Sequence, residues 1–203
     1  MDTNLTYEQS LTLINEMINR ARNNVKQGGA TSLIYWGYLT AALGVTNSVL
    51  MNTLSDPNQS FWIWFLMIPA GFVSYIMERR KDKKRLVKTH IDKIAGMVWA
   101  GFLISFLVFT VVINTVNIKF DLNQIFMLNT PAIMVMVGMG VFISACIFRQ
   151  KMWYINAALT WAGAIVCAFL PVDMQFIVFA VCMILGFAVP GHVLNHQAKK
   201  SHV

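Results

Sequence analysis

The feature that most constrains the fold is the way basic residues alternate with long apolar runs. Fifteen of the 16 Lys and Arg residues lie in alternate gaps between six apolar runs, and only Lys119 lies in the other set of gaps. Because the cytoplasmic loops of membrane proteins carry an excess of Lys and Arg, this pattern predicts a multi-pass membrane protein with both termini in the cytoplasm. The basic set comprises Arg20, Arg22, Lys26, Arg79 to Lys93, Arg149, Lys151, Lys199 and Lys200.

The composition supports a membrane protein and argues against nucleic acid as a partner. Charged residues make up 12% of the 203 residues and hydrophobic ones 57%, whereas a soluble domain carries roughly 25% charged residues. The net charge is +7, but the basic residues border apolar runs and do not form a stripe on a soluble fold. We therefore expect a membrane location, with the anionic inner leaflet as the partner of the basic residues.

The predicted fold is all-α, with six transmembrane helices preceded by a cytoplasmic amphipathic helix. A helix needs about 20 residues to cross the hydrocarbon core, so the second and sixth runs are short for this task. Without the second span, however, the block of basic residues at 79–85 would lie on the outer side. The predicted spans are 32–54, 61–78, 92–117, 125–148, 152–170 and 174–190.

The amphipathic helix is predicted from its cap and its spacing. Residues 6–9 have the pattern of a capping box, and apolar residues follow at alternating spacings of three and four, which places them on one helical face. Gly28-Gly29 is predicted to end the helix. The domains expected are this helix (1–30), the membrane bundle (31–191) and a short basic cytoplasmic tail (192–203). The apolar positions are Leu11, Ile14, Ile18, Ala21 and Val25.

Two regions are candidate contact sites on the cytoplasmic side. Residues 6–27 are too polar to span a membrane, so they are expected to lie on the bilayer, to dock under the bundle, or to pair with a protein partner or a second copy. The basic segment after the second span is expected to contact lipid. The residues predicted for lipid or partner contact are Leu11, Ile14, Ile18, Arg79, Arg80, Lys81, Lys83, Lys84 and Arg85.

Inside the predicted spans, no Asp, Glu, Lys, Arg or His lies near a centre. Such residues would indicate ion coupling or a proton relay, so no catalytic residue and no cofactor is predicted. Neutral residues such as Asn47, Asn114 and Asn156 are expected to form hydrogen bonds between helices, with a solute path as the alternative. Pro69 and Pro190 are expected to kink or end their helices, since each removes a backbone donor.

One pair of histidines is a candidate metal site. His192 and His196 are four residues apart and would share one face of a helix, but no Cys, intervening Glu or third ligand stands at a diagnostic spacing. Histidines at the membrane interface, without metal, are therefore favoured. The three cysteines have no C-x-x-C spacing, and they are expected to act as small apolar residues.

Several segments resemble an uncharacterised family of small six-helix bacterial integral membrane proteins with an N-terminal amphipathic helix. The likeness rests on Leu11-Thr12-Leu13-Ile14-Asn15-Glu16-Met17-Ile18, on Trp36-Gly37 and on Val189-Pro190-Gly191-His192-Val193-Leu194. The resemblance covers most of the chain, and it implies an architecture but no activity.

The function expected is that of a non-enzymatic interaction or regulatory subunit of the inner membrane, acting through its cytoplasmic face. The reason is that the strongly specified features outside the spans, the amphipathic helix and the basic segment, are both predicted to lie on that face. The alternative is a small transporter or channel for a neutral or lipophilic solute, which would use the break at Pro69 and the neutral polar residues.

Overall fold

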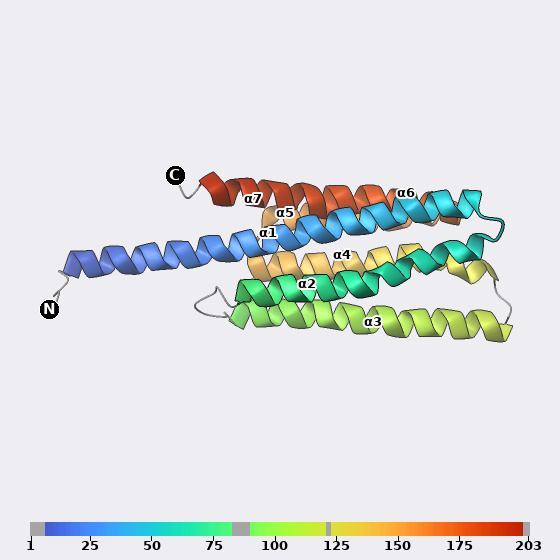
Figure 1. The fold of residues 1–203 in the computed structure, drawn as a ribbon, viewed down its shortest axis with the longest axis horizontal. Helices are drawn as coiled ribbons and strands as arrows, with labels where there is room; N and C mark the ends of the chain where they lie inside the picture. The colour runs from blue at the N-terminus through green and yellow to red at the C-terminus, as the bar shows by residue number, and fades with distance from the viewer. Residues whose placement is uncertain (1–6, 83–89, 121–122, 201–203) are drawn as a thin grey trace.

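The computed structural model describes residues 7–82, 90–120 and 123–200, and the side chains of residues 30–80, 93–120 and 125–197. The described chain is helical and contains no strand (Figure 1). Its α-helices are α1 (Tyr7–Thr53), α2 (Met67–Asp82), α3 (His90–Phe120), α4 (Asn129–Phe148), α5 (Lys151–Cys167), α6 (Val172–Met183) and α7 (Val189–Lys200). Two 3₁₀ helices, η1 (Pro57–Leu66) and η2 (Asn123–Leu128), and a π-helical segment, η3 (Ile184–Ala188), connect them.

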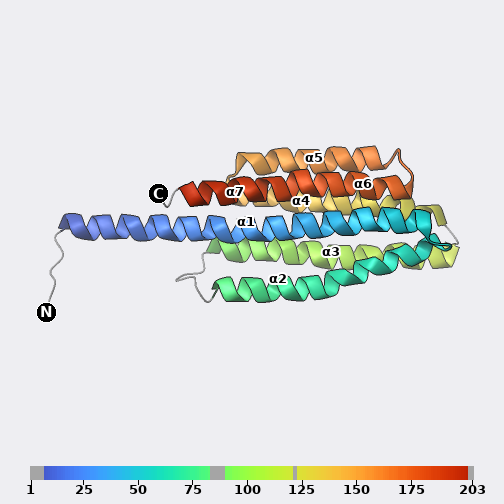
Figure 2. The ribbon, with the colours of Figure 1, turned by 45° about the horizontal axis from the view of Figure 1, so that its top comes forward.

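The helices run roughly parallel to one long axis and form a bundle (Figure 2). Helix α1 packs against α6, η3 and α7, whereas α4 packs against α5 and α3 packs against α4. Five segments of the described chain are long and apolar enough to cross a membrane: 30–53, 57–80, 93–120, 125–148 and 172–197. The all-α class and five of the predicted spans therefore have counterparts in the structure. The fifth predicted span corresponds to α5, which has only 17 residues and is about 25 Å long at 1.5 Å per residue.

The core lies between α1 and α4 to α7. Met134 of α4 and Cys167 of α5 are fully buried, and the Cys167 thiol lies 3.6 Å from the Met134 sulfur. Helix α1 approaches the last helical segments closely at Gly37, where an added Cβ would lie 2.6 Å from the backbone nitrogen of Ala188. Close approach of backbones at small residues is the usual way in which membrane helices gain packing energy.

The predicted end of the N-terminal helix at Gly28-Gly29 is wrong. Helix α1 continues through both glycines and includes the whole first apolar run, so the segment 1–30 is not separated from the bundle by a turn. A glycine inside a helix costs only about 1 kcal/mol relative to alanine. Ala30 follows directly, and no proline or other turn residue stands beside the glycines to end the helix. In both views the N-terminal half of α1 extends past the ends of the other helices (Figure 1 and Figure 2).

Of the two outcomes expected at Pro190, a kink or a helix end, the structure excludes the end, because the helix continues from η3 into α7 and reaches Lys200. The expected tail 192–203 is thus helical over its described part. Proline cannot donate to the carbonyl four residues earlier, and its ring crowds that carbonyl. The π-helical segment η3 ends two residues before Pro190 and contains Gly186, the residue whose carbonyl loses its donor. A wider helical turn is one way to accommodate such a proline without a break.

The helical chain made of η1 and α2 begins earlier than the predicted residue 61, and its irregularity lies where Pro69 was expected to act. The helical chain starts at Pro57, with Asp56 as the N-cap accepting a hydrogen bond from the backbone N–H of Asn58 at 3.0 Å. The 3₁₀ geometry of η1 changes to α geometry at Met67, two residues before Pro69. The carbonyl left without a donor by this proline belongs to Phe65, within the 3₁₀ segment. Helix α3 extends to Phe120, beyond the predicted 117.

Candidate functional site at the basic end of the bundle

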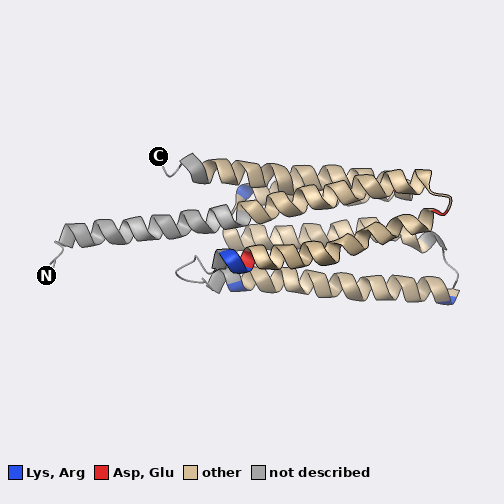
Figure 3. Ribbon diagram, in the orientation of Figure 1, with Lys and Arg blue, Asp and Glu red and all other residues tan. Residues whose placement is uncertain are grey.

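The described basic residues gather at one end of the bundle (Figure 3). Arg79 and Arg80 lie near the end of α2, Lys93 near the start of α3, and Arg149 and Lys151 at the turn between α4 and α5. Lys119 lies in the last turn of α3, at the opposite end. In the described part of the chain, the charge pattern of the sequence therefore separates the two ends of one bundle.

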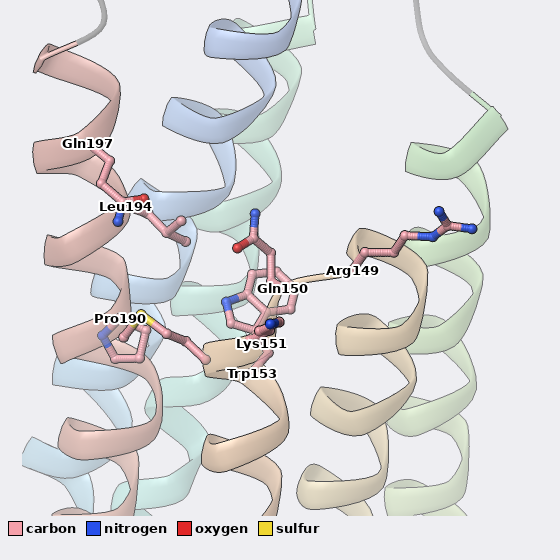
Figure 4. A pocket seen from close by; sticks show the side chains of 8 residues that line it. Arg149, Gln150, Lys151, Trp153, Pro190, Leu194 and Gln197 are labelled. Carbon is pink, nitrogen blue, oxygen red and sulfur yellow. The ribbon is translucent and has the colours of Figure 1, made fainter.

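A cavity of about 390 Å³ lies at this basic end, between the turn from α4 to α5 and helix α7. Gln150, Lys151 and Trp153 line it from the turn and from the first residues of α5, and Pro190 and Leu194 line it from α7. Figure 4 shows Gln150, Lys151 and Trp153 at the start of α5, across from Pro190, Leu194 and Gln197 of α7. The cavity also contacts Arg149, Met152 and Gln197, and its lining contains no acidic side chain. It therefore combines positive charge with an apolar wall.

The turn that carries Arg149 has an unusual backbone. Arg149 has φ 53° and ψ 39°, the left-handed conformation, and it is the one non-glycine residue with positive φ in the described part of the chain. The Gln150 N–H donates to the Ala145 carbonyl at 3.3 Å, which closes the end of α4. Helices commonly end this way, but with glycine, because a Cβ costs about 1–2 kcal/mol there. The Arg149 side chain points away from the other labelled residues in Figure 4, so Lys151 is the cation within their group.

The N-terminus of α5 adds a second source of positive potential beside the cavity. Gln150 is its N-cap, and the Gln150 side chain makes no capping hydrogen bond. The first N–H groups of a helix have no intrahelical partner, and together they carry about half a positive charge. An anion near Lys151 would therefore be stabilised by the helix end as well as by the ammonium group.

Helix α7 connects the cavity to α1. Pro190 and Leu194 face the cavity, while an added Cβ on Gly191 would lie 3.0 Å from the Ala30 carbonyl oxygen. The Tyr38 hydroxyl lies 3.1 Å from His192 Nε2, and the two rings meet edge to face at 5.8 Å. One helix thus contacts α1 through one set of residues and lines the cavity with another.

The predicted lipid-contact residues are only partly described. Arg79 and Arg80 line a second cavity of about 420 Å³ with Phe72, Tyr75 and Ile76, and the Arg79 guanidinium lies 5.3 Å from the centre of the Tyr75 ring. This distance is within the range of a cation–π contact. The Lys81 side chain and residues Lys83, Lys84 and Arg85 lie outside the described part. Leu11, Ile14 and Ile18 belong to the helical backbone of α1, and their side chains are not described.

The predicted histidine pair does not assemble a metal site in the described part of the chain. His192 and His196 both lie on α7, as their spacing predicts, and both are exposed. No group of three His, Cys, Asp or Glu side chains that could hold a metal ion occurs among the described residues. His90, Asp92 and His202 could also contribute ligands on the predicted cytoplasmic side, and their side chains lie outside the described part. His192 is instead positioned beside Tyr38.

The neutral polar residues occupy different environments. Asn47 is fully buried, and its Oδ1 accepts a hydrogen bond from Trp64 Nε1 at 3.2 Å, whereas its Nδ2 has no partner. Asn156 is buried in α5, but Asn114 is exposed on α3 and donates to the Thr110 carbonyl of its own helix. None of the three lines either cavity described above. The predicted hydrogen bonding between helices therefore holds for Asn47.

Sequence reasoning missed Gln175, which joins three segments of the bundle. Its Nε2 lies 3.0–3.1 Å from the carbonyl oxygens of Met127, Cys167 and Leu170, and its side chain is buried. Two of those carbonyls belong to the end of α5 and the turn after it. A helix end leaves carbonyls without donors, so Gln175 satisfies polar groups that the apolar surroundings would leave unpaired.

The cavity beside Lys151 was missed as well. The sequence identifies Arg149 and Lys151 as basic and Trp153 as a residue at a span end, but it assigned Leu194 and Gln197 to a separate tail. The continuation of α7 beyond Pro190 is what brings these residues to the turn between α4 and α5. Comparison of this chain with models of protein families, with curated proteins and with solved structures finds no match.

Proposed function

We propose that the protein is a non-enzymatic docking subunit of the bacterial inner membrane, with six spans, both termini in the cytoplasm, and the N-terminal half of α1 as its docking arm. The observation that carries this proposal is the continuity of α1 from Tyr7 to Thr53. An amphipathic helix joined to a span by a turn can lie flat on the bilayer. A helix that continues without a break from a span keeps the direction of the span, so the arm extends into the cytoplasm.

The orientation rests on the distribution of charge. The described basic residues apart from Lys119 share the end of the bundle from which the arm extends, and Lys and Arg are enriched on the cytoplasmic side. An impermeant amine reagent added to intact spheroplasts should label Lys119. It should not label Lys83 until the membrane is opened. Labelling of Lys83 in sealed spheroplasts would contradict the orientation.

The spacing of apolar residues in the arm suits another helix as its partner. Tyr7, Leu11, Ile14, Ile18 and Ala21 follow one another at spacings of four, three, four and three, and Val25 follows at a spacing of four. This is the a/d repeat of a two-stranded coiled coil, extending over nearly three heptads. The helical backbone places these positions along one stripe.

The charges of the arm favour a helix of a different protein, and not the arm of a second copy, as its partner. Two copies in one membrane would have parallel arms, so Arg20, Arg22 and Lys26 of one copy would lie level with the same three cations of the other. Glu8 is the one acidic residue among the positions that flank the stripe, and it lies at the other end of the arm, too far away to offset this repulsion. The partner we infer is an amphipathic helix of a cytoplasmic protein, with Asp or Glu beside its apolar stripe at the membrane-proximal end.

A crosslinking pair tests this proposal. A photoreactive residue is introduced in place of Ala21, within the stripe, or in place of Asn23, on the opposite face. Crosslinked peptides from intact cells are then identified by mass spectrometry. We expect Ala21 to capture the apolar face of an acidic amphipathic helix in one cytoplasmic protein, and Asn23 to capture far less of it. Capture of lipid alone, or of a second copy alone, from the Ala21 position would refute the proposal.

A further inference from the structure

The cavity beside Lys151 has the chemistry of an anion site. Lys151 lies among Gln150 and Trp153 in the cavity wall, and no acidic residue lines it. The N-terminus of α5, without a side-chain cap, lies beside the same space. A cation and a helix N-terminus that converge on one cavity stabilise a negatively charged group more strongly than either does alone.

The wall of the cavity on α7 is largely apolar. Pro190 and Leu194 line it beside the polar Gln197, and Met152 and the Trp153 ring add apolar surface from α5. A small inorganic anion would gain no binding energy from these apolar side chains, because the anion has no apolar surface to bury against them. A molecule with an anionic group joined to a hydrocarbon portion would use both sides of the cavity.

The position of the cavity indicates which class of ligand it binds. It lies at the end of the bundle where the apolar spans stop and the basic residues begin. Trp153 is an amphipathic side chain of the kind that is enriched at the headgroup level of a bilayer. Basic pockets between transmembrane helices at this level bind the headgroups of anionic lipids.

We propose that this cavity binds an anionic phospholipid, with its phosphate beside Lys151 and the N-terminus of α5 and its glycerol and acyl portions against Trp153, Pro190 and Leu194. The inference does not depend on the docking arm. The lipid would bridge the turn between α4 and α5 and helix α7, which also contacts α1 through Gly191. The site is distinct from the basic segment at 79–85, because the lining residues come from other helices.

The test measures binding to the purified full-length protein in a neutral detergent. Dihexanoyl phosphatidylglycerol is compared with dihexanoyl phosphatidylcholine and with inorganic phosphate, by calorimetry and by the shift in thermal unfolding. We expect saturable binding of the phosphatidylglycerol at about 1:1 and much weaker binding of the other two. Equal binding of phosphatidylcholine would overturn the proposal in favour of an apolar groove for any lipid. Equal binding of inorganic phosphate would overturn it in favour of a small-anion site.

Variants locate the binding. Lys151→Gln should weaken phosphatidylglycerol binding by roughly fivefold, the effect of one lysine near an anionic group. Lys151→Arg should retain most of the affinity. The matched control is Lys119→Gln, which removes the same charge at the opposite end of the bundle and should leave the affinity unchanged. An equal loss in both Gln variants would show that net charge, and not this cavity, attracts the lipid, and would overturn the assignment. The unfolding temperature without lipid establishes that each variant is folded.

Discussion

The bundle contains two regions that differ in how their apolar surface is covered. In the most apolar stretch of segment 172–197, 56% of the residues are buried inside the protein, whereas only 11% are buried in segment 57–80 and 6% in segment 93–120. The glycines show the same contrast. An added Cβ on Gly37 or Gly191 would meet backbone atoms at 3.0 Å or less, but on Gly71 or Gly96 it would meet nothing within 4 Å.

The contrast shows that apolar sequence and packing are separate properties in this chain. Lipid tails are as apolar as leucine side chains, so a transmembrane helix gains little from burying leucine against its neighbours and depends on close packing and hydrogen bonds. Helix α1 and helices α4 to α7 have such contacts. Helices α2 and α3 present large exposed side chains such as Phe72 and Leu107. Substitutions at matched positions in the two regions should therefore differ widely in their effect on stability.

The largest difference is expected between two glycine substitutions. Gly37→Leu would force α1 away from Ala188, because the atom that the new Cβ meets at 2.6 Å belongs to the backbone and cannot rotate aside. We expect a loss of about 3 kcal/mol or more in unfolding free energy, the upper end for overpacked cores. Gly96→Leu on α3 has open space and should change stability by less than about 1 kcal/mol. Unfolding in increasing SDS measures both, and equal losses would contradict the contrast.

An amide truncation should have the next largest effect. Gln175→Ala removes the donor for the carbonyls of Met127, Cys167 and Leu170 and leaves a cavity in a buried site. A loss of about 2–3 kcal/mol is expected for buried polar groups left unpaired. Asn114→Ala on α3 removes only a hydrogen bond to the carbonyl four residues earlier in the same helix, and it should be close to neutral. The same SDS titration tests the pair, and a neutral Gln175→Ala variant would show that water or lipid replaces the amide.

The same substitution, Met to Ala, can be compared at a buried and at an exposed position. Met134 is fully buried in α4, whereas Met97 on α3 is 55% exposed. Met134→Ala leaves a cavity, which costs about 2 kcal/mol at the low end for soluble cores. We take the low end because the apolar transfer part of that cost is small in a bilayer. Met97→Ala should cost less than about 0.5 kcal/mol. A cost at Met97 close to that at Met134 would indicate that α3 packs against something in the membrane.

Much of the fold follows from the sequence because the relevant signals are local. Apolar runs and the basic residues between them predict the helices, and the structure has a helix at each of the six runs. The sequence was least informative where a residue that weakens a helix did not end it. Gly28, Gly29 and Pro190 each weaken a helix, yet the chain remains helical at all three positions. In α7 the irregularity is absorbed by the π-helical turn before Pro190.

The candidate site could be predicted only in part, for a related reason. Lys151 and Trp153 are conspicuous in the sequence, but the other half of the cavity comes from Pro190 and Leu194, about 40 residues later. Their meeting depends on the continuation of α7 and on the close contact between Gly191 and α1. The role of Gln175 is even harder to predict from the sequence, because it depends on the three backbone carbonyls that surround its side-chain amide. Periodicity predicts which residues share a face, but not which faces meet.

The smallest expected effect concerns the contact that holds α2 to the packed region. Trp36 Nε1 donates to Ser74 Oγ at 3.2 Å, and the Tyr35 hydroxyl donates to the Ala70 carbonyl at 3.0 Å. A hydrogen bond between membrane helices contributes about 0.6 kcal/mol on average, so Ser74→Ala should lower stability by about that amount. A double-mutant cycle with Trp36→Phe separates this hydrogen bond from the packing of the indole ring. A coupling energy near zero would mean that the bond holds α2 no better than lipid does. A coupling above about 1.5 kcal/mol would show that α2 belongs to the closely packed group of α1 and α4 to α7. Helix α3 would then be the loosely packed helix of the two.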